Sequence, residues 1–325
     1  MLKFDLVCLG ELLVDLFPAE VGRKLAEVTA FRPKPGGAPA NVAVAAARLG
    51  LKAAFIGKVG DEAFGHMLLD TVQREGVDTS GMRLDAEART TLAFIAMPDV
   101  NTSEFIFYRN PGADLRLNEE ELDRDLLRSA RAFHCGSLSL GAEPARTATH
   151  IAVDIARTAG ALVSFDVNYR ASLWKSTDEA LECIWKLLPK ANLLKVNEVE
   201  LKLLSGRDGL EQAAGSLLGK GPELIVVTLG AQGSFYCTAQ TSGFVEAFKV
   251  ETVDATGCGD AFIAGLLSRL VRAGDWRSHL TTTHLYRDFR YANAVGAITA
   301  LTLGVIPALP SAEQVDRFLE NNPEK

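Results

Sequence analysis

Short apolar runs alternate along the chain with segments in which apolar residues recur at helical spacing. Strand-length runs occur at 4–10, 53–59, 131–136, 162–166, 193–196, 224–229 and 234–238. Helical spacing occurs between them, for example at 40–49, 62–75, 146–158, 211–218 and 288–301. Several strands are apolar throughout, as expected where helices cover both faces of a parallel sheet. The alternation predicts a doubly wound α/β sandwich.

Two segments, 12–35 and 90–112, break this alternation. They are rich in strand-forming residues, with strands expected at 91–97 and 104–109, and no helical pattern lies within them. One interpretation is a small antiparallel sheet that stands off the main sheet, for example as a lid. The other is a set of edge strands of the main sheet, and the pattern alone leaves both open.

Composition excludes several classes of function. The chain has 325 residues, and its net charge is 34 − 41 = −7 without a basic tract of five or more residues. We therefore expect neither nucleic-acid nor anionic-membrane partners. No apolar run reaches the ~18 residues of a membrane span, and the run after Met1 is too short for a secretory signal.

The five cysteines are odd in number and form no C-x-x-C pair. They are expected to be free thiols in a reducing compartment, so we expect a cytoplasmic protein. The five histidines show no zinc-binding spacing.

The run DATGCGDAF at 254–262 carries the strongest chemical signal. A helical pattern begins near Gly259, and the glycines on either side of Cys258 allow backbone N–H groups to converge at a helix N-terminus, which suits an anion. Asp260 lies in this first turn, where phosphate would repel a carboxylate unless it served as a general base. The alternative is an aspartate that caps its own helix beside a tight turn.

A second run, GGAPAN at 36–41, allows a close approach of the backbone to a ligand through Gly36 and Gly37. Pro39 suits a first helical turn, and Asn41 offers a bidentate amide there. An ordinary strand-to-helix turn explains this run equally well. The sequence lacks a P-loop, the protein-kinase motifs and a G-x-G-x-x-G after its first strand, which excludes those nucleotide-binding classes.

Together these runs resemble the N-terminal and C-terminal signatures of the ribokinase-like (PfkB) carbohydrate kinases. Intermediate markers match in order at 60–65, 197–200, 227–233 and 293–297, so the resemblance covers roughly 4–311. It implies a three-layer α/β sandwich with a mostly parallel central sheet and a small β-sheet lid. The chain would then form one kinase domain, 1–325, with lid segments at approximately 12–35 and 90–112.

The resemblance also assigns roles to the two runs. Asp260 is the expected base that takes a proton from the sugar hydroxyl, and the backbone of Gly257, Cys258 and Gly259 is the expected anion hole. Cys258 stands where the family usually has alanine and puts a modifiable thiol beside the phosphate. The residues expected to bind the sugar are Asp15, Gly36, Gly37, Asn41, Arg109 and Arg170.

The resemblance implies ATP and Mg²⁺ as cofactors. The residues expected to bind ATP are Asn168, Asn197, Thr228, Gly230, Gly233 and Asn293. Glu200 is expected to hold Mg²⁺ through water, and an Asn197–Glu200 helix cap is a credible reading that is compatible with this role. The resemblance also implies a monovalent cation, K⁺, bound by Asp254 and carbonyls near 300–304.

Two further runs favour one substrate. The stretch 165–174 looks like the D-x-N-x-R-x-x-L-W run of fructokinases and 2-keto-3-deoxygluconate kinases, and 108–114 resembles the fructokinase Y-R-N-P-S-A-D run, with Gly112 in place of serine. The leading prediction is a fructokinase. The alternatives are a 2-keto-3-deoxygluconate kinase, another sugar or nucleoside kinase, and an inactive sugar-binding relative. A homodimer through the lid also follows from the resemblance, whereas the segment 276–286 matches no motif.

Overall fold

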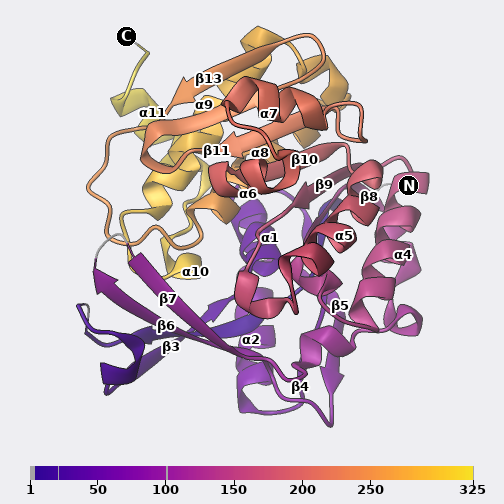
Figure 1. Cartoon of the computed structure of the whole chain (residues 1–325), viewed down its shortest axis with the longest axis vertical. Helices are drawn as coiled ribbons and strands as arrows, with labels where there is room; N and C mark the ends of the chain where they lie inside the picture. The colour runs from indigo at the N-terminus through magenta and orange to yellow at the C-terminus, as the bar shows by residue number, and fades with distance from the viewer. Residues whose placement is uncertain (1–3, 21, 100–101, 325) are drawn as a thin grey trace.

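The computed structural model of the chain describes residues 4–20, 22–99 and 102–324. Residues 21, 100 and 101, which fall in the two expected lid segments, lie outside the described residues. Helices cover both faces of a large twisted sheet, and a smaller sheet stands to one side of it (Figure 1). The expected α/β sandwich with a mostly parallel central sheet is confirmed.

Within the described residues, the large sheet has nine strands in the order β13-β12-β11-β10-β9-β8-β1-β4-β5. The strands from β11 to β5 in this order are parallel, and β12 and β13 add an antiparallel edge. Their bounds are β1 Phe4–Leu9, β4 Ala53–Gly60, β5 Asp78–Asp85, β8 Ala130–Gly136, β9 Leu162–Asp166, β10 Leu193–Asn197, β11 Leu224–Thr228, β12 Gly233–Cys237 and β13 Ser242–Glu246.

Two hydrophobic clusters, one on each face of the large sheet, form the core. Alternate residues of β1 enter different clusters: Leu6 and Cys8 face one helical layer, and Val7 and Leu9 face the other. This explains why β1 is apolar from Leu6 to Leu9, since this part of the strand is covered on both sides and has no solvent face. The helices are α1 Ala38–Arg48, α2 Ala63–Arg74, α3 Arg124–Arg128, α4 Ala145–Thr158, α5 Thr177–Leu187, α6 Glu198–Ser205, α7 Leu210–Leu217, α8 Cys258–Arg272, α9 Thr282–Thr299, α10 Val305–Ala308 and α11 Ala312–Asn321.

The smaller sheet contains β2 Leu13–Pro18, β3 Phe31–Gly36, β6 Leu92–Asp99 and β7 Thr102–Tyr108, in the order β3-β2-β6-β7. These strands form a sheet of their own, so the alternative of edge strands on the main sheet is wrong. The expectation of an antiparallel arrangement fails for one pair, because β2 and β6 run parallel. Between β2 and β6 the chain forms β3 of the smaller sheet and then β4 and β5 of the main sheet. It re-enters the smaller sheet as β6, which runs in the same direction as β2.

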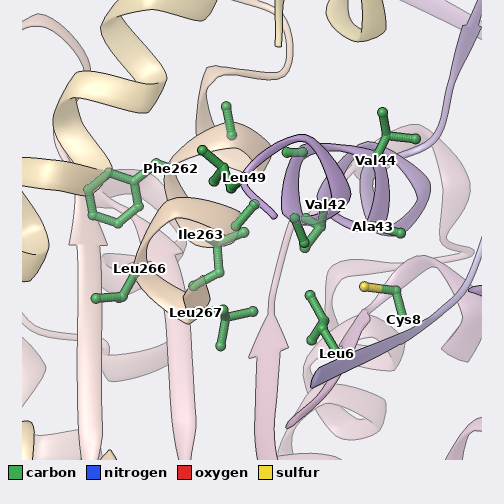
Figure 2. Close-up of a cluster of buried hydrophobic side chains, with 14 of the residues drawn as sticks. Leu6, Cys8, Val42, Ala43, Val44, Leu49, Phe262, Ile263, Leu266 and Leu267 are labelled. Carbon is green, nitrogen blue, oxygen red and sulfur yellow. The ribbon is translucent and has the colours of Figure 1, made fainter. Parts of the chain in front are cut away.

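The helices that follow the two signature runs pack side by side. Figure 2 shows Val42 of α1 on the side of Ile263 and Leu267 of α8, above the Leu6 side chain of β1, and Ala43 above Cys8. The packing brings the N-termini of α1 and α8 to the same place.

The pattern of apolar residues in the sequence did not predict β5, β13 or the first turns of α9. Strands β5 and β13 carry mixed polar and apolar residues, so neither gives a continuous apolar run. Helix α9 starts at Thr282, six residues before the expected start at 288, because the Thr281 side chain caps it. The unassigned segment 276–286 therefore forms a 3₁₀ turn, Trp276–His279, and the first turn of α9. None of the helices in the described ranges has the length and apolar character needed to cross a bilayer.

Candidate active site

The two signature runs meet through a hydrogen bond between their polar side chains. The amide Nδ2 of Asn41, in the first turn of α1, donates to Oδ2 of Asp260 at 2.8 Å. Asp260 lies in the first turn of α8. The packing of α1 on α8 therefore places an amide and a carboxylate from opposite ends of the chain in direct contact.

Asp260 is held close to the pH range in which a carboxylate exchanges protons. Burial raises its pKa to about 6, while the Asn41 hydrogen bond and the Lys195 ammonium act in the opposite direction. A carboxylate of this kind is ionised at neutral pH and is basic enough to accept a proton.

The N-terminus of α8 has the backbone shape expected of an anion hole. Gly257 has φ +76°, and a Cβ there would overlap Val305 Cγ1, so only glycine suits this position. The helix starts at Cys258, and its first N–H groups lack partners within the helix. Burial raises the pKa of the Cys258 thiol to about 12, with the charges of Asp254 and Asp260 adding to the effect. The thiol therefore stays protonated and is a poor nucleophile.

A buried ion pair lies under this turn. Lys195 Nζ is 2.8 Å from Asp166 Oδ2, and both side chains are nearly inaccessible. A Cβ on Gly259 would be 3.0 Å from Lys195 Nζ, so the ammonium touches the first turn of α8. Burial lowers the pKa of Lys195, but the charges of Asp166, Glu200 and Asp260 together with the Asp166 hydrogen bond outweigh it and keep the pKa above its usual value. Lys195 thus remains a cation beneath the expected anion hole.

The expected sugar-binding carboxylate, Asp15, faces the glycine run. A Cβ on Gly36 would overlap Asp15 Oδ2, and one on Gly37, where φ is +107°, would overlap the carbonyl oxygen of Glu11. Burial raises the pKa of Asp15 to about 7, and the charge of Asp260 acts in the same direction. The structure thus brings Asp15, Gly36, Gly37, Asn41 and Asp260 together.

The two candidate arginines differ in their surroundings. Arg109 is buried, pairs with Asp114 and donates to the carbonyl of Leu138, at 3.3 Å from both terminal nitrogens. This ion pair commits its guanidinium within the protein. Arg170 is half-buried and lowers the pKa of both Asp15 and Asp260. It therefore faces the centre of the site.

Asn197 and Glu200 form the helix cap that was one of the two readings of their motif. Glu200 Oε2 accepts the Asn197 N–H and Oε1 accepts the Tyr169 N–H, at 2.8 and 2.7 Å. Burial raises the pKa of Glu200, and the charge of Asp166 adds to it. Asp166 Oδ1 is buried and has no hydrogen-bond partner among the described residues. Two repelling carboxylates, one with an unpaired oxygen, fit a hydrated divalent cation.

The expected nucleotide residues lie at the ends of β9 to β12. Asn168 has φ +39°, the sole positive φ of a non-glycine residue within the described chain. Thr228 ends β11, and Gly230 and Gly233, with φ of +56° and +127°, flank the turn into β12. Asn293, on α9, instead connects its helix to two strands. Its Oδ1 accepts from Ser234 Oγ on β12, and its Nδ2 donates to two carbonyls of β13. Its amide is engaged within the protein.

Asp254 is buried, and both of its carboxylate oxygens accept hydrogen bonds from the backbone. Its Oδ1 accepts the Thr256 N–H and its Oδ2 accepts the Gly304 N–H, both at 2.9 Å. The Ala300 carbonyl accepts the N–H groups of Val253 and Asp254, at 2.8 and 3.2 Å. The carboxylate therefore joins the loop before α8 to the loop after α9.

Sequence reasoning missed four charged residues of this region: Glu11, Asp114, Asp166 and Lys195. Burial raises the pKa of Glu11 to about 7, and its Oε2 is buried without a hydrogen-bond partner among the described residues. Lys195 was detectable, because a lysine within an apolar strand is a buried charge that needs a partner. Asp166 and Asp114 fell within the runs that were recognised, but their ion pairs depend on strands that only the fold brings together.

Comparisons with known proteins agree on one family. A family model described as "pfkB family carbohydrate kinase" matches residues 3–312. Fructokinase-1 of Zea mays is 46% identical over 315 residues, which cover 97% of this chain and 97% of that protein.

Solved structures give the same result. A fructokinase from Xylella fastidiosa with bound ATP has a TM-score of 0.90 at 31% identity, covering 98% of this chain and 99% of that one. A fructokinase double mutant from Vibrio cholerae, bound to fructose, ADP and potassium ion, has a TM-score of 0.87 at 31% identity, covering 98% of this chain and 99% of that one. A putative Ribokinase II from E. coli in complex with ATP and Mg²⁺ has a TM-score of 0.86 at 27% identity, covering 98% of this chain and 100% of that one.

Proposed function

The chain belongs to the pfkB family of carbohydrate kinases, and from this premise we propose that it is a fructokinase. It transfers the terminal phosphoryl group of ATP to O6 of D-fructose and releases ADP. The observation that carries the proposal is the buried carboxylate of Asp260, held by Asn41 at the N-terminus of α8. The high identity to plant fructokinases over the whole chain supports the choice of fructose.

The chemistry follows from the positions of the side chains. Asp260 takes the proton from the sugar hydroxyl while the oxygen forms its bond to phosphorus and the bond to the ADP oxygen breaks. The backbone N–H groups of Gly257, Cys258 and Gly259 stabilise the charge on the transferred group, and the helix N-terminus adds to this. The Lys195 ammonium beneath the turn contributes positive charge in the same place.

Asp15 and Asn41 orient the sugar beside Asp260. Carboxylate and amide groups each bind adjacent hydroxyls, and the missing side chains of Gly36 and Gly37 leave room for the backbone to approach the ligand. Asp166 and Glu200 would hold Mg²⁺, Glu200 through water, and the ion would supply positive charge against the phosphates. The loops at Asn168, Thr228 and Gly230–Gly233 hold the nucleotide.

One contact weakens the alternative of a 2-keto-3-deoxygluconate kinase. That substrate carries a carboxylate and needs a cationic partner, for which Arg109 and Arg170 were the candidates. Arg109 is committed to Asp114, so Arg170 alone faces the site. A neutral hexose requires neither.

The smaller sheet supports two further proposals. It acts as a lid, because β2 and β3 carry Asp15 and Gly36 and close over the sugar. It also pairs with a second copy of the chain through β7, its edge strand, where Ile106 and Tyr108 are 51% and 65% exposed. Light scattering on the purified protein tests this pairing: a dimer that Ile106→Lys turns into a monomer supports it, and a monomeric wild type rejects it.

We also propose a reducing, cytoplasmic location. All five cysteines are free thiols in the structure, and four of them are buried. Structural disulfides are rare in such compartments.

A coupled assay with fructose, 2-keto-3-deoxygluconate, ribose, glucose and adenosine tests the activity, and fructose should give the highest kcat/KM. In Asp260→Asn, turnover should fall by at least ~10²-fold while nucleotide binding survives, because a general base contributes roughly 10²–10⁴-fold. Asp70→Asn, an exposed substitution on α2, is the matched control. Near-normal turnover of Asp260→Asn would remove this residue from the role of base, and a preference for another sugar would reject fructose.

A further inference from the structure

A lysine of the smaller sheet reaches into the main body of the protein. Lys34 lies on β3, and its Nζ donates to the carbonyl oxygen of Leu303 at 2.6 Å. The ammonium also lies 5.6 Å from the centroid of the Phe17 ring. A Cβ on Gly304 would overlap Lys34 Cδ, so the lysine stem packs directly on this glycine.

The loop that Lys34 contacts supports the expected anion hole. The Gly304 N–H donates to Asp254 Oδ2 at 2.9 Å, and the other oxygen of that carboxylate binds the loop before α8. The next residue, Val305, packs against Gly257 so closely that a Cβ on Gly257 would overlap it. A continuous series of contacts therefore joins β3 to the first turn of α8.

Lys34 is also tied to the sugar side of the site. It stands opposite Asp15 in the register of β2 and β3, and it precedes Gly36 by two residues on the same strand. A displacement of β3 around a sugar would move the Lys34 backbone with it. One lysine thus connects the two strands that carry Asp15 and Gly36 with the loop behind the phosphate position.

With the Lys34 ammonium in place, the groups that the family resemblance assigns to K⁺ do not fit that ion. Both oxygens of Asp254 accept backbone N–H groups, and the Ala300 carbonyl already accepts two. The Leu303 carbonyl accepts the Lys34 ammonium. A second cation at this loop would meet a fixed positive charge, and like charges repel strongly at short range in a partly buried site.

We propose that Lys34 is a positioning residue whose ammonium takes the place of a monovalent cation, bracing the 303–305 loop and through it Gly257. The inference rests on the proposed kinase function. Its consequence is that phosphoryl transfer by this chain is independent of K⁺, unlike a relative in which the ion itself would hold this loop.

The test compares cations at constant ionic strength. Fructose and ATP kinetics are measured on the full-length protein in potassium, sodium or tetramethylammonium chloride. Wild-type kcat should differ by less than about twofold between the salts. Lys34→Met should lose at least ~10-fold in kcat in tetramethylammonium, and potassium should restore part of this loss. Fructose KM should change less than kcat, because the loop supports the phosphate position.

Two variants and a second readout complete the design. Lys52→Met, at an exposed lysine in the loop before β4, should behave as wild type, and Lys34→Arg should retain turnover because it keeps the charge. In thermal unfolding, potassium should raise the Tm of Lys34→Met above its value in tetramethylammonium and leave wild type unchanged. This readout needs no turnover, so it separates failure of the inference from failure of the proposed activity.

Three results would overturn the inference. The first is activation of wild type by potassium of about threefold or more over tetramethylammonium. The second is unchanged turnover of Lys34→Met, and the third is a loss that potassium neither restores in turnover nor offsets in Tm. If Lys34→Met does not fold, Lys34→Gln replaces it in the same comparison.

Discussion

The Asp260 carboxylate lies where burial, the Asn41 amide and the Lys195 ammonium act on it together. Burial favours the protonated form and the other two favour the ionised form, and the balance leaves the pKa at about 6. At the residue scale, this balance would let the proposed site keep a carboxylate beside a phosphate. The group is ionised at neutral pH, yet it binds a proton more readily than an exposed aspartate does.

This balance predicts the acid limb of the activity profile. Because the base must be unprotonated, kcat for fructose should rise with pH through an apparent pKa of about 6. In Asn41→Ala the limb should move to higher pH by about one unit, since a hydrogen bond to a charged group is worth roughly 1.5–3 kcal/mol and one unit is about 1.4 kcal/mol. Asn321→Ala, at the exposed end of α11, is the control. An acid limb that stays in place would show that Asn41 does not stabilise the ionised base.

At the element scale, the first turn of α8 depends on one backbone conformation. Gly257 adopts a left-handed φ of +76° and touches Val305 of α10. The turn is fixed from outside the helix, because α10 follows the loop that Asp254 and Lys34 hold. The direction of the N–H groups in the first turn of α8 therefore depends on α10 and on the loop before it as well as on α8 itself.

Two glycines of this helix provide a matched pair. Gly274, just after α8, has φ +79° and no neighbour within 4 Å of an added Cβ. Gly274→Ala should therefore lower the free energy of unfolding only by the ~1–2 kcal/mol that a left-handed conformation costs a residue with a side chain. Gly257→Ala should lose more stability and at least ~10-fold in kcat, because its Cβ overlaps Val305 and shifts the anion hole. Denaturant unfolding and steady-state kinetics measure both. Equal effects of the two substitutions on kcat would contradict this account.

At the scale of the whole molecule, the site concentrates buried acidic groups that the fold must accommodate. Burial raises the pKa of both Asp15 and Glu11 to about 7, well above the values of exposed carboxyls. The folded protein thus holds protons at pH 6 that the unfolded chain has released. Stability from these groups is fully present below pH 4 and is lost as the pH rises through about 7.

The free energy of unfolding should therefore fall between pH 6 and pH 8 in the protein without ligands. Each group contributes up to about 1.4 kcal/mol per pH unit in this window. Asp15→Asn should remove part of the slope, whereas Asp70→Asn, which is exposed, should leave it unchanged. Urea unfolding at several pH values measures both. A stability that rises over this range would mean that Asp15 and Glu11 are ionised in the folded protein at pH 6.

The sequence by itself determined the class of fold and the family, and it located the proposed centre of the chemistry. Strands such as β1 and β11 are predominantly apolar because both faces are covered, and that signal is local. The two signature runs carried Gly257, Asp260, Gly36 and Asn41 because glycine and polar residues at a helix start are visible without a fold. The resemblance to the pfkB family, which rests on several such runs in order, is confirmed.

Only the tertiary structure decided which charges meet. Asp166 and Lys195 come from neighbouring strands, Arg109 pairs with Asp114 across a loop, and Lys34 contacts a carbonyl 269 positions away in the chain. Such pairs depend on strand order, helix packing and the angle of the smaller sheet, which are set by burial of apolar surface over the whole chain. The same packing gives Asp260, Asp15 and Glu11 their raised pKa values, because desolvation is a property of everything that surrounds a group.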